Sequence, residues 1–137
     1  MKVVALDYGS ARTGVAVSDP SGTIARPLCV VERAATEAGV ARLAELVRAE
    51  QAERVVVGLP LTLRGEHGAQ ARETEEFVEA LRAAVDVPVE SYDERFTTRL
   101  ARTRPRDSPS DRSEPDDARA AAHLLSSYLE WSIARRK

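Results

Sequence analysis

The sequence is poor in cysteine, histidine, lysine and aromatic residues. Its 137 residues include one cysteine, two histidines, one tryptophan, three tyrosines and two phenylalanines. The lone Cys29 excludes an internal disulfide and leaves no second thiol for a metal or redox pair. Because a chain without disulfides suits a reducing compartment, we expect a cytoplasmic protein.

Long hydrophobic runs are also missing. No apolar stretch approaches the ~18 residues that a membrane span requires, and the first residues reach a charge at Asp7 within a few positions. We therefore expect neither a membrane span nor a secretory signal. A chain of this length buries about two-thirds of its unfolded surface, so we expect residues 1–137 to form a single domain.

The charge is balanced over the whole chain but not along it. A formal net charge of -2 and a pI of 5.8 give no general attraction to phosphate. All but two of the 20 basic residues are arginine, whose forked guanidinium matches phosphate oxygens. Five arginines lie between Arg99 and Arg112, opposed by two aspartates. Two interpretations of this segment stay open, a solvated loop and a contact with nucleic acid.

The hydrophobic pattern predicts a meander of three strands, followed by alternating helices and strands. The predicted strands cover residues 2–6, 13–18, 23–31, 54–59 and 87–92, and the predicted helices cover about 35–50, 69–85 and 116–133. Proline, arginine and serine at 102–114 predict a flexible loop before the last helix. This order predicts an α/β fold, a mixed five-stranded sheet flanked by helices, as in ribonuclease-H-like proteins.

Acidic side chains lie at the ends of two predicted strands. Asp7 ends the first strand, and Gly9 and Gly14 after it leave room for close approach to a ligand. Asp93 and Glu94 end the last strand, and the pattern alone does not choose between them. Sites in α/β sheets lie where strands end and loops begin, so these carboxylates are candidate ligands. Taken singly, each is equally well explained as a turn or capping residue.

A third candidate carboxylate belongs to the first turn of the last helix. Asp117 shares a helix face with Ala121, Leu124 and Tyr128, whereas Asp116 shares another face with Ser127. A carboxylate on an apolar face is costly to bury unless a cation or hydrogen-bond donors satisfy it. Together the three positions predict a site for Mg²⁺ or Mn²⁺, which prefer carboxylate oxygens. Such a site favours metal-assisted cleavage of phosphodiesters.

Four segments, taken in order, form a pattern that covers nearly the whole chain. They are Asp-Tyr-Gly-Ser-Ala-Arg-Thr-Gly-Val-Ala at 7–16, Val-Gly-Leu-Pro at 57–60 with Gly65 and Gly68, Asp-Glu-Arg-Phe-Thr-Thr at 93–98, and Asp117 with Ala120, Ala121, Tyr128 and Leu129. This pattern resembles the YqgF (RuvX) family. The resemblance implies a ribonuclease-H-like fold and a nuclease that matures the 5′ end of pre-16S ribosomal RNA, or alternatively a Holliday junction resolvase.

The resemblance also implies a role for each motif residue. It makes the catalytic carboxylates Asp7, one of Asp93 and Glu94, and Asp117; we take Glu94 as the catalytic member of that pair. The candidate metal ligands are therefore Asp7, Asp93, Glu94 and Asp117. Arg12 and Arg95 lie inside these motifs and are candidate substrate-binding residues, and the local excess of arginine adds Arg104 and Arg106 as further candidates. Segment 102–115 departs from the family, whose members typically have a helix and a lysine-rich loop there.

The expected partners are pre-rRNA or structured DNA and ribosomal particles, with the chain acting as a monomer or homodimer. A kinase-like ATP-binding domain also carries Asp-x-Gly after its first strand, but it holds nucleotide between two domains, and 137 residues supply one. A non-catalytic RNA-binding module is a further alternative. Clustered carboxylates disfavour it, because they repel phosphate unless a metal neutralises them.

Overall fold

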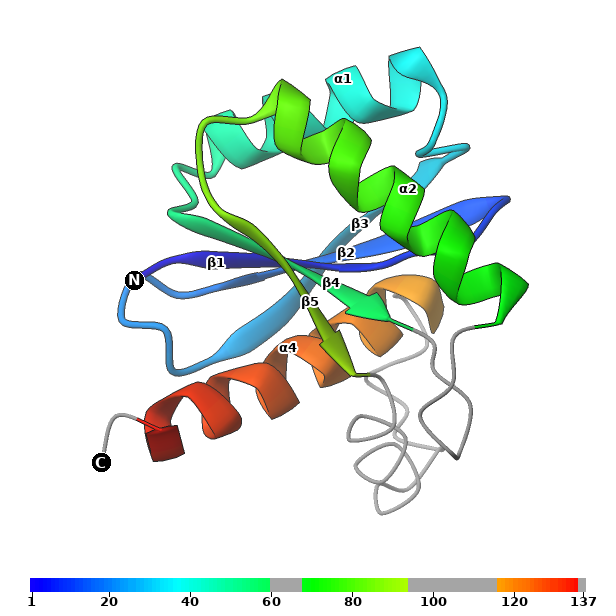
Figure 1. Ribbon diagram of the computed structural model, residues 1–137. Coiled ribbons are helices and arrows are strands. Elements are labelled where there is room, and N and C mark those ends of the chain that lie inside the picture. Colours follow the sequence, from blue (N-terminus) through cyan, green and yellow to red (C-terminus); the bar gives the residue numbers. More distant parts are fainter. Residues whose placement is uncertain (60–67, 94–115, 136–137) are drawn as a thin grey trace.

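The computed structural model describes residues 1–59, 68–93 and 116–135. Within these ranges, strands and helices follow the predicted order (Figure 1). The strands are β1 (Val3–Asp7), β2 (Arg12–Ser18), β3 (Ala25–Glu32), β4 (Arg54–Leu59) and β5 (Val89–Asp93), and the helices are α1 (Glu37–Ala49), α2 (Ala69–Ala84) and α4 (Asp116–Arg135). None of these helices is long and apolar enough to cross a membrane.

The five strands form one mixed sheet in the order β3-β2-β1-β4-β5. β1 pairs antiparallel with β2, and β2 with β3, whereas β1, β4 and β5 run parallel. The predicted mixed sheet is therefore confirmed. Because parallel strands end on the same side, the carboxyl ends of β1, β4 and β5 share one edge of the sheet. We call this edge the carboxyl edge.

Two strands begin two residues later than predicted, each for a local reason. β5 begins at Val89 because Pro88 accepts a hydrogen bond from the Val55 amide at 2.9 Å but has no N–H to donate. β3 begins at Ala25 because the Asp19 carboxylate accepts a hydrogen bond from the Ile24 amide at 2.9 Å, which keeps that residue in the preceding turn.

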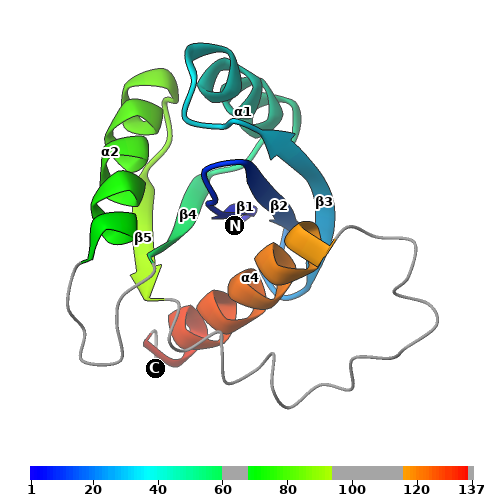
Figure 2. The same cartoon turned by 90° about the vertical axis from the view of Figure 1, so that its right-hand side faces the viewer.

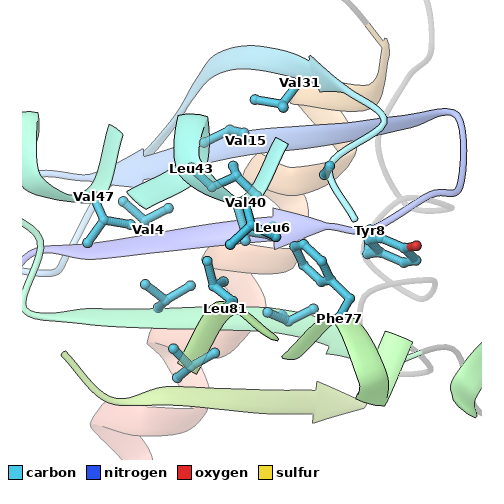
Figure 3. Packing of buried hydrophobic residues seen from close by; sticks show 14 of the residues in the cluster. Val4, Leu6, Tyr8, Val15, Val31, Val40, Leu43, Val47, Phe77 and Leu81 are labelled. Atoms are coloured by element: carbon cyan, nitrogen blue, oxygen red, sulfur yellow. The ribbon is translucent and has the colours of Figure 1, made fainter. Parts of the chain in front are cut away.

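Helices cover both faces of the sheet. α1 and α2 lie on one face, and α4 crosses the other (Figure 2). We call these the α1–α2 face and the α4 face. Successive strand residues alternate between them, so Val4 and Leu6 of β1 pack under α1 and α2, whereas Val3 and Ala5 pack under α4. Figure 3 shows the α1–α2 face filled by valine, leucine and phenylalanine side chains.

The predicted apolar stripe of α4 is buried, and its neighbouring face is partly buried too. Ala121, Leu124 and Tyr128 are at most 2% exposed, as expected. The structure differs at Ser127, which the sequence places on the other face. Ser127 is buried, and its hydroxyl shares a 2.8 Å hydrogen bond with the Tyr92 hydroxyl. The Arg54 guanidinium donates to the Tyr128 hydroxyl at 2.9 Å, so polar contacts tie α4 to both β4 and β5.

Candidate active site

The carboxyl edge carries the predicted acidic residues that the structure describes. Asp7 is the last residue of β1, and Asp93 is the last residue of β5. α4 begins at Asp116 at the same edge, with its first turn against β2 (Figure 1). The backbone therefore brings two strand ends and one helix start to one side of the sheet, as predicted.

Gly14 is the contact that brings the backbone of Asp117 to the strand partner of Asp7. Gly14 is the strand partner of Asp7 in the β1–β2 pair. Alternation from Ala5 and Ala16, which pack under α4, puts both residues on the α4 face. A Cβ atom added to Gly14 would lie 1.8 Å from the backbone oxygen of Asp117, so only glycine allows this approach. The first turn of α4 thus rests on the strand partner of Asp7.

Arg12 joins the same corner of the molecule. Its Nε atom lies 3.4 Å from Oδ2 of Asp117, and the two side chains are 65% and 39% exposed. An ion pair this open to water contributes little to stability. The Arg12 guanidinium can therefore exchange the Asp117 carboxylate for a phosphate oxygen at small cost.

The turn between β1 and β2 is tightly closed. A Cβ atom added to Gly9 would lie 2.5 Å from the Arg12 carbonyl oxygen, so the backbone of the turn itself, rather than a ligand, fills the space that this glycine leaves. The buried Thr13 hydroxyl lies 3.4 Å from both the amide and the carbonyl oxygen of Gly9. The Arg33 amide donates to the Ala11 carbonyl at 3.0 Å. The segment between β3 and α1 therefore also holds this turn.

Helix α2 contacts the turn from the opposite face. The Tyr8 ring stacks on Phe77, with centroids 4.5 Å apart (Figure 3). The Ser10 hydroxyl donates to Glu73 Oε2 at 3.0 Å, and the same carboxylate lies near the Tyr8 hydroxyl. Burial, followed by the charge of Glu73, raises the pKa of the Tyr8 hydroxyl, so it stays protonated. Glu73 is not predictable as a contact of this turn from the sequence, because an exposed helical glutamate carries no sign of so distant a partner.

The remaining predicted residues do not all join this corner. Val89 packs on the α1–α2 face and Tyr92 on the α4 face, so alternation puts Asp93 on the α1–α2 face, away from Asp7. Across the described ranges, no three acidic, histidine or cysteine side chains form a group that could hold a metal ion. The other predicted site residues, Glu94, Arg95, Arg104 and Arg106, and the predicted loop at 102–114 lie outside the described residues.

Comparison with known proteins identifies the family. The model of the RuvX family, described as Holliday junction resolvase, matches residues 1–131. The chain belongs to the RuvX (YqgF) family. Relatives from Chloroflexus aggregans and Rubrobacter xylanophilus, both named "Putative pre-16S rRNA nuclease", are 43% and 47% identical over 131 residues. These matches cover 93% and 94% of this chain and 92% of each relative. The family description and both names denote nucleases, so this RuvX chain is a nuclease acting on nucleic acid.

Solved structures confirm the predicted ribonuclease-H-like α/β fold. Thermus thermophilus RuvC, solved in complex with a Holliday junction substrate, has a TM-score of 0.65 at 16% identity. The match covers 98% of the RuvX chain and 96% of RuvC. Fowlpox virus resolvase, solved with Holliday junction DNA, has a TM-score of 0.57 at 12% identity, with 97% and 99% covered. At these identities the likeness establishes the fold alone.

Proposed function

We propose that this RuvX protein is a divalent-metal-dependent nuclease that processes the 5′ end of pre-16S rRNA, with Asp7, Glu94 and Asp117 as its catalytic carboxylates. The observation that carries the proposal is the contact at Gly14, where the first turn of α4 rests against the strand partner of Asp7. The relatives named for pre-16S rRNA, at up to 47% identity, support this choice of substrate.

The donor set fits a hard divalent cation. Asp7 and Asp117 offer carboxylate oxygens on one face of the carboxyl edge, and such oxygens are preferred by Mg²⁺ and Mn²⁺. We assign the third ligand to Glu94 rather than Asp93, because alternation puts Asp93 on the opposite face. When bound, the cation activates a water molecule and neutralises charge on the phosphate.

Arginines complete the proposed site. Arg12 orients the scissile phosphate, because its exposed guanidinium lies beside Asp117 and presents two parallel donors. Arg95, Arg104 and Arg106 contact the nucleic-acid backbone farther from the reacting bond in this proposal. The acidic groups therefore hold the cation, while the arginines supply the attraction for phosphate that the net charge of -2 does not.

A second candidate function is the resolution of Holliday junctions, which the description of the family favours. A four-way junction has two-fold symmetry, so a resolvase needs two active sites in a symmetric homodimer. Trimming an rRNA precursor needs no such symmetry and places the protein on ribosomal particles. Substrate choice and oligomeric state therefore distinguish the two functions.

A cleavage panel tests the proposal. The purified protein is incubated with 5′-extended 16S rRNA fragments, single-stranded RNA and DNA, and four-way DNA junctions, each with Mg²⁺, Mn²⁺ or EDTA. The Asp7→Asn protein, purified in parallel, measures contaminating nuclease. We expect metal-dependent cleavage that favours the rRNA precursor. Symmetric nicking of junctions with no action on the precursor would favour the second candidate, and undiminished cleavage in EDTA would contradict metal dependence.

A further inference from the structure

One carboxylate of α2 contacts the β1–β2 turn. Glu73 accepts a hydrogen bond from the Ser10 hydroxyl at 3.0 Å, and its charge lies close enough to the Tyr8 hydroxyl to raise the pKa of that group. One helical turn further along α2, Phe77 stacks on the ring of Tyr8 with an interplanar angle of 23°. Figure 3 shows the Tyr8 oxygen at the outer end of this stack, directed away from the aliphatic core. Two residues of α2 therefore contact neighbouring residues of the turn, Phe77 at Tyr8 and Glu73 at Ser10.

This contact lies next to the proposed catalytic carboxylate. Tyr8 directly follows Asp7, and the peptide bond between them is planar, so the orientation of Tyr8 restricts that of Asp7. Gly9 comes next and, having no Cβ, offers the least resistance to rotation of the backbone. On the other face, the turn is held by α4 at Gly14 and Arg12. The contact with α2 is therefore the second one that holds the β1–β2 turn, and it lies on the face opposite the proposed catalytic carboxylates.

Neither charge nor global stability explains a glutamate at this position. Because Glu73 bonds to Ser10, between Asp7 and Arg12, its negative charge lies near the edge where phosphate would bind and weakens that binding. Its hydrogen bond with Ser10 is exposed to water, and such bonds contribute little to the stability of the whole fold. The remaining benefit is local order in the turn.

Resting on the proposed nuclease function, we propose that Glu73 is a positioning residue. By accepting from Ser10, next to the Tyr8 ring that Phe77 stacks on, it holds the β1–β2 turn so that the Asp7 carboxylate stays directed to the α4 face. Glu73 itself touches neither substrate nor cation in this proposal. Its effect on catalysis passes through the backbone of the turn, and it appears in kcat rather than in KM.

Three variants separate this role from charge and from folding. Glu73→Ala removes the acceptor, Glu73→Gln keeps an acceptor oxygen without the charge, and Glu76→Ala removes a charge of the same helix that also acts on Tyr8. Amide hydrogen exchange in metal-free protein reports order in the turn directly. We expect exchange at residues 8–13 to quicken at least about fivefold in Glu73→Ala alone, with β5 and α4 unchanged. Melting temperatures should agree closely across the set.

Kinetics supply the second measurement. Because a misplacement of about 1 Å costs up to about 100-fold in rate, Glu73→Ala should lower kcat by about 10- to 100-fold, with KM within about twofold. Glu73→Gln should keep kcat within about threefold of the parent, as expected for a retained acceptor. The double variant Tyr8→Phe with Ser10→Ala should match Glu73→Ala, and adding Glu73→Ala to it should have no further effect.

Each outcome decides the proposal. Unchanged exchange in the turn of Glu73→Ala would overturn it, as would a loss of activity shared by Glu76→Ala or confined to KM. A Glu73→Gln protein as impaired as Glu73→Ala would also overturn it, since charge would then be the cause. If the parent protein cleaves no nucleic acid, the proposed function fails, while hydrogen exchange still decides whether Glu73 holds the turn.

Discussion

Near the carboxyl edge the two faces of the sheet are filled by side chains of different size, and the proposed site lies on the face with the smaller ones. On the α1–α2 face, valine, leucine and phenylalanine separate helix and sheet by full side chains. On the α4 face near the carboxyl edge, Ala5, Gly14 and Ala16 of the sheet meet Ala118 and Ala121 of the helix. Small residues let backbones approach, so a polar helix start reaches a polar strand end.

The far end of α4 is packed differently, through large aromatic side chains. There Tyr128 packs edge-on against Tyr92, with ring centroids 5.6 Å apart, and Trp131 contacts both rings. The helix therefore rests on backbone at its first turn and on aromatic rings at its last turns. The large side chains of the α1–α2 face and of the far end of α4 supply apolar burial, which is the main source of stability. The close backbone contact at Gly14 instead brings charged groups near one another.

The largest effect should come from Asp7→Asn, which tests whether the chemistry belongs to the α4 face. Even partners that only orient a metal ligand contribute about 10- to 100-fold, so loss of a ligand should lower kcat/KM by more than about 100-fold. The melting temperature should stay unchanged or rise, because repulsion between carboxylates is relieved. Asp86→Asn, an exposed aspartate beyond α2, is the matched control. A fully active Asp7→Asn protein would contradict the site.

Two core variants should both lower stability but differ in their effect on activity. Gly14→Ala puts a methyl group where the Asp117 carbonyl lies, so α4 must shift; we expect about 1–3 kcal/mol of destabilisation and a loss of up to about 100-fold in kcat/KM. Leu81→Ala, on the α1–α2 face, should cost about 2–5 kcal/mol with little change in the activity of folded molecules. Urea unfolding and cleavage rates measure both. Equal losses of activity in the two variants would contradict the proposal that activity depends on packing at the α4 face.

A smaller effect is expected at Arg12. In Arg12→Ala we expect the log-log salt dependence of nucleic-acid binding to become shallower by about 0.7 to 0.9, with nearly unchanged stability because the ion pair with Asp117 is exposed. Arg26→Ala is the matched control, since Arg26 lies at the start of β3, is 61% exposed and pairs with Glu50 at the end of α1. Fluorescence anisotropy across a salt series measures both slopes. Equal slopes in the two variants would mean that phosphate binds elsewhere.

The smallest effect concerns the β2–β3 turn, at the opposite end of the sheet. Hydrogen bonds from the Ile24 amide, the Ser21 hydroxyl and the Thr23 amide lower the pKa of Asp19. A carboxyl group with a lowered pKa stabilises the fold above its unfolded pKa of about 3.9, and this stabilisation is lost as pH falls toward the folded value. Asp19→Asn should therefore unfold at lower urea than the parent at pH 7, and the gap should narrow at pH 3. Cleavage at pH 7 should be unaffected in the folded variant.

The order of elements follows from local sequence. Runs of β-branched residues and the change of period after β3 suffice for it, because strand and helix periods are properties of the backbone. Asp7 is confirmed at a strand end, and the apolar stripe predicted to follow Asp117 on its helix is buried, although the Asp117 side chain itself is 39% exposed. Strand boundaries were less well predicted, since single hydrogen bonds at Pro88 and Asp19 decide them.

Contacts between distant residues were decided only by the tertiary structure. The sequence predicts that Gly14 leaves room for close approach. That the approaching group is the first turn of α4, 102 residues later, depends on how this helix packs across the sheet. The same holds for Glu73, whose partners Tyr8 and Ser10 lie more than 60 residues away. The periodicity of a strand or helix determines which face a residue occupies. Which residue it contacts across that face depends on the side-chain volumes and the register of both elements.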